Sequence, residues 1–271
     1  MKMEVGKPQR YAVVTGASTG LGAAFARQLA KTGKSLVLVS LPKEGLTQFA
    51  AQLEAEYGIS TLVIEADLTL QEERKWVVLK LEEVRPGIDL LINNAGIGGS
   101  QAFETATSQW LSQIIALNIM HTALFIHALL PALKRVPKAN ILNVSSMAGL
   151  TPMPFKTVYP ASKAFITSFS LGLDAELRES TNIRVFALHP GGMMTNADVS
   201  RRLKNQNWLG RKSVFEVDEI AKIGLRGIQR GNPIIIPGWS NRLNYLLFKW
   251  IPWSIRSGAL VRFMKKELEL P

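Results

Sequence analysis

The sequence predicts a single doubly wound α/β domain with a mainly parallel sheet of seven strands. Short runs rich in Val, Ile and Leu alternate with amphipathic stretches of helical period almost from the first residue. Most of these runs are apolar throughout, as expected of strands buried on both faces. No internal repeat, low-complexity tract or linker divides the 271 residues, so one domain is the simplest interpretation.

Seven strands and six main helices are expected along the chain. The expected strands are Tyr11–Thr15, Ser35–Ser40, Thr61–Glu65, Ile88–Asn93, Asn140–Ser145, Ile183–Leu188 and Ile234–Ile236. The expected helices are Leu21–Lys31, Leu46–Tyr57, Gln71–Val84, Trp110–Leu133, Ala161–Glu179 and Val217–Gln229. Because strands and helices alternate, right-handed crossovers should make the strands parallel and cover both faces of the sheet.

Two segments depart from this alternation. Residues 191–215 are basic and poor in either period, which predicts a loop, and residues 239–271 extend past the last strand. We therefore place the α/β domain at residues 1–238, followed by a basic, aromatic C-terminal extension at 239–271.

The composition excludes several kinds of chemistry. The chain has no cysteine, so it has no disulfides, thiolate nucleophiles or cysteine-bound zinc. The positions of His121, His127 and His189 do not suggest a metal site, and no metal is expected. The N-terminus lacks a secretory apolar region, and no apolar run reaches the ~18 residues of a membrane-spanning helix. We expect a cytoplasmic protein.

A glycine-rich turn follows the first expected strand. It reads Thr15-Gly-Ala-Ser-Thr-Gly-Leu-Gly22 and leads into a helix. Glycines at 16, 20 and 22 would let a pyrophosphate approach the backbone, next to the free N–H groups of the helix N-terminus. An ordinary glycine-rich turn would give the same pattern, but a P-loop would not, because no Gly-Lys-Ser/Thr closes it.

Tyr159 and Lys163 form the pair most suggestive of catalysis. They are four residues apart at the start of an expected helix, since Pro160 fits only in a first turn. A neighbouring ammonium would lower the pKa of the phenol, making it a usable acid or base. A surface Tyr–Lys pair would have the same spacing, so the pair gains weight only from neighbouring segments. These are Asn93–Gly96 and Ser145-Ser146 at strand ends, and Asn118 within an apolar helix.

Together these segments resemble the short-chain dehydrogenase/reductase family in its common form of about 250 residues, which implies a Rossmann-type fold. The matching segments, in family order between residues 10 and about 195, are Thr15–Gly22, Asp67-Leu68, Asn93–Gly96, Asn118, Asn143–Ser146, Tyr159–Lys163 and Pro190-Gly191 with Thr195. The glycine turn differs from the T-G-x-x-G-x-x-G of the extended branch. The resemblance implies hydride transfer between a nicotinamide cofactor and a carbonyl or secondary alcohol.

The resemblance also assigns catalytic roles. Tyr159 would exchange a proton with the substrate oxygen, and Lys163 would bind the nicotinamide ribose and lower the pKa of Tyr159. Ser146, thirteen residues before Tyr159, would hold the carbonyl. Asn118 would help to position a water that relays protons to Lys163.

Cofactor contacts are implied along the whole carboxyl edge of the sheet. The implied residues are Gly16, Ser18, Thr19, Gly20, Leu21, Gly22, Ser40, Lys43, Asp67, Leu68, Asn94, Ala95, Gly96, Tyr159, Lys163, Pro190, Gly191 and Thr195. Position 41, where the family often places Asp or Arg, is Leu. With no acidic group there, and with Ser40 and Lys43 nearby, we favour NADP(H) over NAD(H).

The loop and the helices suggest a substrate type and an assembly. Met193, Met194, Leu203, Trp208 and Leu209 could form an apolar pocket for a hydrophobic carbonyl or alcohol, or could be scattered along a surface loop. Family analogy suggests a homodimer or homotetramer through the Trp110–Leu133 and Ala161–Glu179 helices.

The C-terminal extension leaves several functions open. Residues 201–271 hold fourteen Lys/Arg against five Asp/Glu, and the extension mixes cations with aromatic residues. It could pack over the substrate pocket or a subunit interface, contact a membrane surface, or bind an acidic protein. Nucleic acid is the least expected partner. A non-catalytic dinucleotide-binding scaffold and a peripheral membrane protein remain alternatives to the enzyme.

Overall fold

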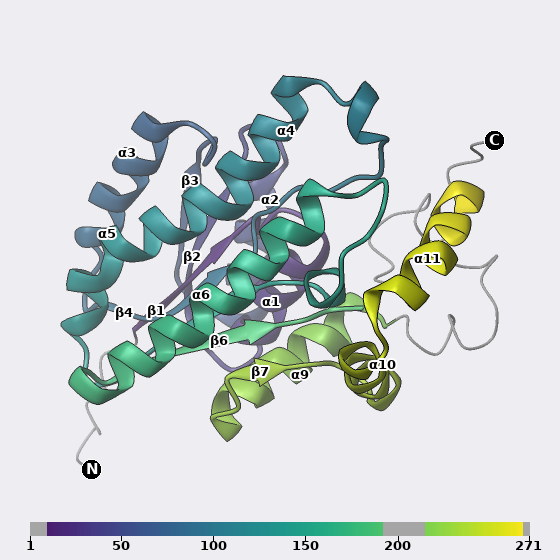
Figure 1. Ribbon diagram of the computed structural model, residues 1–271. Helices are drawn as coiled ribbons and strands as arrows, with labels where there is room; N and C mark the ends of the chain where they lie inside the picture. The colour runs from purple at the N-terminus through teal and green to yellow at the C-terminus, as the bar shows by residue number, and fades with distance from the viewer. Residues whose placement is uncertain (1–9, 192–214, 268–271) are drawn as a thin grey trace, which may run out of the picture.

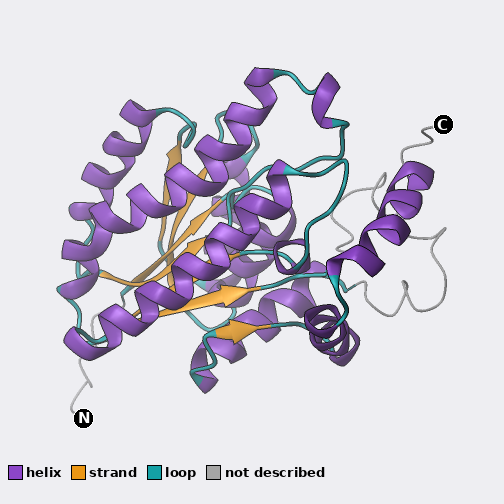
Figure 2. Ribbon diagram, viewed as in Figure 1, coloured by secondary structure: helices purple, strands orange, loops and turns teal. Residues whose placement is uncertain are grey.

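The computed structural model describes residues 10–191 and 215–267, which form one α/β domain (Figures 1 and 2). Seven parallel strands form a single sheet in the order β3-β2-β1-β4-β5-β6-β7. The strands are β1 Tyr11–Thr15, β2 Ser35–Ser40, β3 Thr61–Glu65, β4 Ile88–Asn93, β5 Ala139–Val144, β6 Ile183–Leu188 and β7 Ile234–Ile235. The sequence-based prediction of the fold class is confirmed, with strand ends shifted by at most one residue.

Helices cover both faces of the sheet (Figure 1). One face carries α1 Gly20–Ala30, α2 Leu46–Tyr57 and α9 Val217–Arg230. The other carries α3 Gln71–Glu82, the continuous helix α4–η2–α5 and α6 Val158–Ser180. The short 3-10 helices are η1 Phe103–Thr105 and η3 Met147–Leu150. The C-terminal extension forms α10 Trp239–Trp250 and α11 Trp253–Glu267.

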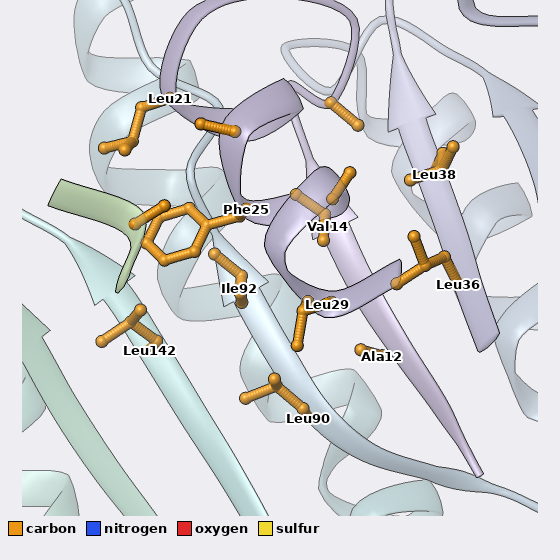
Figure 3. Close-up of a cluster of buried hydrophobic side chains, with 14 of the residues drawn as sticks. Ala12, Val14, Leu21, Phe25, Leu29, Leu36, Leu38, Leu90, Ile92 and Leu142 are labelled. Atoms are coloured by element: carbon orange, nitrogen blue, oxygen red, sulfur yellow. The ribbon is translucent and has the colours of Figure 1, made fainter. Parts of the chain in front are cut away.

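The strands are apolar at successive positions and contribute to two hydrophobic cores, one on each face of the sheet. Neighbouring residues of a strand point to opposite faces, so Val13 and Val14 enter different cores although both are fully buried. On the α1 face, Phe25 points from the helix toward Ile92 and Leu142 of the strands (Figure 3). A polar residue on either face of these strands would leave a buried group without water.

The expected helix Trp110–Leu133 has an irregular middle. It is built from α4 Ser108–Ile114, the π-helical η2 Ile115–His121 and α5 Thr122–Lys134. Contrary to our expectation, the run Ser108–Lys134 is long and apolar enough in composition to cross a membrane. Its buried side chains, including Ile114, Phe125 and Leu129, pack against the sheet, so in this fold it serves as a core helix.

Helix α6 is anchored to β6 by the carboxylate of Asp174. The carboxylate accepts hydrogen bonds from Arg184 Nε at 2.8 Å, Arg184 Nη2 at 3.1 Å and the backbone N of Val185 at 2.9 Å. Burial alone would raise the pKa of Asp174, but these hydrogen bonds outweigh it and hold the pKa below its ordinary value. The anchor matters for the site because α6 also carries Tyr159 and Lys163.

We expect Asp174→Asn to lower the free energy of unfolding at neutral pH by about 1–3 kcal/mol, since charged hydrogen bonds are lost. The pKa of Asp174 is depressed in the folded state, so its contribution is present above the unfolded pKa of about 3.9 and disappears as the pH falls through the lower, folded value. Denaturant unfolding at several pH values should therefore show the difference from wild type shrinking in acid. Glu176→Gln, on the exposed side of α6, is the control, and a difference independent of pH would contradict the assignment.

Candidate active site

The four candidate catalytic residues come from separate elements and meet near the carboxyl end of β5. Ser146 follows β5 and caps η3, where its hydroxyl accepts a hydrogen bond from Ala148 N at 3.1 Å. Tyr159 and Lys163 lie in the first two turns of α6, which begins at Val158. Asn118 lies in the π-helical segment η2 and is fully buried.

Ser146 lies close enough to Tyr159 for its hydroxyl to influence the phenol by hydrogen bonding. Burial raises the pKa of Tyr159, and the hydrogen bond with Ser146 opposes that rise in part. The lowering of the pKa of Tyr159 that we expected from Lys163 is wrong for this geometry. The ammonium lies 5.8 Å from the centre of the phenol ring and donates to Val144 O at 2.9 Å, so burial is the largest influence on the phenol.

Lys163 is almost completely buried, with 4% of its surface exposed. Burial lowers the pKa of its ammonium group to about 8, because removing water disfavours the charged form. Ser145 fixes the same turn of helix by donating from Oγ to Lys163 O at 2.8 Å. The structure thus separates the two adjacent serines: Ser145 holds α6 against β5, and Ser146 contacts the phenol.

Asn118 connects three segments around the site. Its Oδ1 accepts from Ile97 N at 3.0 Å, and its Nδ2 donates to Ile97 O and to Ser162 Oγ, both at 2.9 Å. A Cβ at Gly96 would lie 3.1 Å from Asn118 Oδ1 and 3.2 Å from Lys163 Nζ, so the two polar groups approach the same point. The side chain therefore positions the segment after β4 against α6, and the water relay stays a prediction.

The glycine-rich turn has the geometry that a phosphate cradle requires. Gly16 and Gly20 have φ values of +62° and +54°, which favour glycine. A Cβ at Gly22 would lie 1.9 Å from Gly16 O, so no larger residue fits there without a shift. Asn94 completes the turn, because its Nδ2 donates to Thr15 O at 3.0 Å and to Gly16 O at 3.1 Å.

A cleft of about 410 Å³ runs from this turn to Tyr159 and Lys163. The expected cofactor residues that line it are Gly16, Ser18, Thr19, Leu21, Ser40, Asp67, Leu68, Asn94, Ala95, Gly96, Tyr159 and Lys163. Gly20, Gly22, Lys43, Pro190 and Gly191 are not among its lining residues, and Thr195 lies outside the described residues. A dinucleotide fits this cleft, because the backbone of the glycine turn can take the pyrophosphate and polar groups lie at the strand ends.

The sequence analysis missed one charged residue of the cleft. Glu44 lines it and accepts a hydrogen bond from Ser18 Oγ. Lys43, which we expected to contribute, is exposed with a φ of +66°. The signal that could have pointed to Glu44 is its place in the loop after β2, where the family reads the ribose. Ile97, Gly98 and Leu117 were also missed.

A second pocket of about 380 Å³ is almost entirely apolar. It is lined by Gly149, Leu150, Thr151, Pro152, Met153, Pro154, Thr157, Pro160, Ala161, Ala164 and Trp253. It therefore lies between η3, the first turns of α6 and the beginning of α11. Trp253 belongs to the C-terminal extension and lines this pocket. Its position supports one of the alternatives for the extension, namely that it packs over a pocket next to the site.

The fold and the cleft together define an oxidoreductase that uses a nicotinamide dinucleotide. The family model for short chain dehydrogenases matches residues 10–206, and this chain belongs to that family, which confirms the resemblance. A very-long-chain 3-oxoacyl-CoA reductase of Anas platyrhynchos is 38% identical over 96% of this chain and 84% of its own length.

Two solved structures show the same architecture. The bulky-bulky ketone specific alcohol dehydrogenase of Comamonas testosteroni is 31% identical, with a TM-score of 0.76 over 91% of this chain and 96% of that one. A short-chain dehydrogenase of Sphingobium yanoikuyae in complex with NADPH is 30% identical, with a TM-score of 0.77 over 90% and 97% of the two chains.

We expect Gly22→Ala to raise the Kd for NADPH and for NADH at least about tenfold, because the new Cβ cannot coexist with Gly16 O in the present turn. Fluorescence titration of the reduced dinucleotide measures this. Gly172→Ala is the matched control, since a Cβ there meets nothing within 4 Å. An unchanged Kd for Gly22→Ala would contradict the assignment of this turn as the phosphate cradle.

Proposed function

We propose that this enzyme reduces the carbonyl group of a hydrophobic substrate with NADPH, using Tyr159 as the proton donor. The observation that carries the proposal is that Ser146 and buried Lys163 lie beside Tyr159 at the end of the dinucleotide cleft. The cofactor supplies the hydride when it is bound. The protein then has to hold the carbonyl, neutralise the developing oxyanion and exclude water.

The electrostatics of the site support reduction. Because burial raises the pKa of Tyr159, the phenol is protonated at neutral pH and can give its proton to the developing alkoxide. Ser146 would hold the carbonyl oxygen beside the phenol. Lys163, with a pKa of about 8, keeps its positive charge near neutral pH, where it would bind the ribose of the cofactor.

NADP(H) is the proposed cofactor form. Ser40 and Leu41, at the end of β2, are neutral and line the cleft, so neither repels a 2′-phosphate. The Sphingobium yanoikuyae relative carries NADPH in its solved structure. Glu44 is the opposing feature, since its carboxylate also lines the cleft. Its hydrogen bond with Ser18 engages part of that negative charge.

The proposed substrate class is a 3-oxoacyl thioester or a related bulky ketone. The support comes from the apolar pocket beside the site and from the relatives, one of which is a 3-oxoacyl-CoA reductase and another specific for bulky ketones. Proline, methionine and tryptophan side chains offer an alkyl chain dispersion contacts without hydrogen-bond partners. The residues of the expected loop pocket, Met193 to Leu209, lie outside the described residues.

The proposed assembly is a cytoplasmic homodimer or homotetramer. Helices α4–α5 and α6 would form the contact, because Ile115, Met120 and Leu124 are large apolar side chains exposed on the outer side of the first of these helices.

We expect Tyr159→Phe to lower kcat/KM for reduction by about 10²–10⁴-fold, because the proton donor is removed while the ring remains. A panel of 3-oxoacyl thioesters and bulky ketones should be assayed with NADPH and in parallel with NADH, for which we expect a lower kcat/KM. The Kd for NADPH should stay near the wild-type value. Tyr57→Phe, at the end of α2, is the control, and a fully active Tyr159→Phe variant would refute the mechanism.

We expect Trp253→Ala to raise KM for long-chain substrates by about tenfold while leaving kcat and the KM of short-chain substrates near wild type. The reason is that the indole forms one wall of the apolar pocket and contributes through buried area. Trp76→Ala is the matched control, since Trp76 on α3 is 45% exposed and Trp253 is 43% exposed. If Trp253→Ala changed KM equally for substrates of every chain length, the alkyl chain would not bind in this pocket. That result would leave the proposed role of Tyr159 unaffected.

A further inference from the structure

Helix α10 turns its apolar side to the outside of the molecule. Trp239, Leu243, Leu246 and Trp250 follow the i, i+4, i+7, i+11 spacing of one helix face and are 70%, 47%, 52% and 81% exposed. Two polar residues of α10 face the protein instead. Ser240 and Asn241 are buried, and Asn241 Nδ2 donates to Pro237 O at 2.8 Å. A soluble surface helix has the reverse arrangement.

The apolar surface continues onto α11. Ile255 and Phe263, eight residues apart on one side of that helix, are 69% and 52% exposed, whereas Met264 is fully buried. Of the eighteen large apolar side chains exposed on the described residues, nine lie between Trp239 and Phe263. The patch therefore belongs to the C-terminal helices and is not the general background of surface leucines.

Hydrogen bonds tie both helices to the domain, and on α10 Arg242 Nε donates to Ile236 O at 3.1 Å. Arg256 Nη1 donates to Thr151 Oγ1 at 3.1 Å, which ties α11 to the end of η3. Figure 1 shows α10 and α11 beyond the carboxyl ends of β6 and β7, on the edge of the sheet that carries the site. An exposed apolar face on an ordered, anchored element points to a partner that covers it.

Cations accompany the apolar side chains. Arg242 is exposed one residue from Leu243, and Arg262 is exposed beside Phe263. Residues 239–271 hold six Lys/Arg against two Asp/Glu, within a chain of net charge +11. Trp, Leu and Ile with interspersed arginines are the composition of helices that lie in the interface of anionic bilayers.

We propose that α10 and α11 dock this enzyme on an anionic lipid surface, with the apolar face of α10 in the headgroup–acyl boundary. The twelve residues of α10 span only about 18 Å, less than the ~30 Å hydrocarbon core, so the helix lies along the surface and does not cross it. Anionic headgroups complement the cations. A second copy of the chain fits less well, because a two-fold contact through this face would bring the same positive charges together.

The test is flotation of the full-length protein with vesicles of phosphatidylcholine, with or without about one third phosphatidylserine. We expect wild type to bind the anionic vesicles, less strongly at about 0.5 M salt than at about 0.1 M. The double variant Leu246→Gln, Trp250→Gln should bind at least about tenfold more weakly. The control is Trp76→Gln, Leu79→Gln, which removes two exposed apolar side chains from α3 and should bind as wild type does.

Three outcomes would overturn the proposal. These are absence of wild-type binding to anionic vesicles, equal weakening by the α3 control, and equal binding to neutral vesicles, which would remove the role of the cations. Sedimentation velocity separates the alternative partner: if the α10 variant changes the mass of the assembly and wild type does not float, a second copy covers the face. The α10 variant is also assayed for reductase activity on a soluble short-chain substrate. Activity there shows that the variant is folded, so that a loss of vesicle binding is not mistaken for a loss of catalysis.

Discussion

The attachment of α6 to the carboxyl end of β5 is the contact on which the site depends. Lys163 Nζ donates to Val144 O at 2.9 Å, and Ser145 Oγ returns a hydrogen bond to Lys163 O at 2.8 Å. About two turns further along α6, Asn143 Nδ2 donates to Ser170 Oγ at 2.9 Å. All of these groups are buried, so a shift of the helix along the strand would leave several polar atoms unpaired away from water. Such a shift would also separate Ser146, which follows β5, from Tyr159, which begins α6.

This attachment also determines the charge balance of the site. Lys163 enters the interior with the rest of the helix, and burial brings its pKa down to about 8. The buried histidines add no positive charge at neutral pH, because burial lowers the pKa of His121 to about 3 and that of His189 to about 4. Lys163, whose Nζ lies 5.8 Å from the centre of the Tyr159 ring, is therefore a cation of the site, while the phenol keeps its proton. A protonated acid beside a cation is the state from which a carbonyl can be reduced.

The strands and most helices could be predicted because their signal is local. A run such as Leu36–Val39 is apolar on both faces, and only a doubly covered sheet accommodates that. That Tyr159 and Lys163 share one side of a helix could be predicted because residues four apart lie one turn from each other. The direction of the pKa shift of Tyr159 could not be predicted. It depends on how deeply the fold buries the phenol and on where Lys163 Nζ points, and both are set by the tertiary structure.

Other features escaped prediction for related reasons. The π-helical segment Ile115–His121 is as apolar as the α-helix around it, so its sequence does not mark it. In the structure this segment carries Asn118, which is hydrogen-bonded to Ile97 and Ser162. Glu44 enters the cleft through the conformation of the loop after β2. The outward apolar face of α10 is visible as a helical spacing in the sequence, but the sequence cannot say which side of that helix the domain covers.

A short path connects the C-terminal helices to the catalytic serine. Ser146 caps η3, η3 ends at Leu150, and the next residue, Thr151, accepts the hydrogen bond from Arg256 of α11. The same segment and Trp253 line the apolar pocket. The hydrogen bond from Arg256 therefore couples the position of α11 to the backbone that follows Ser146. The C-terminal extension thus contributes to the wall of a pocket that also includes Pro160, the residue after Tyr159.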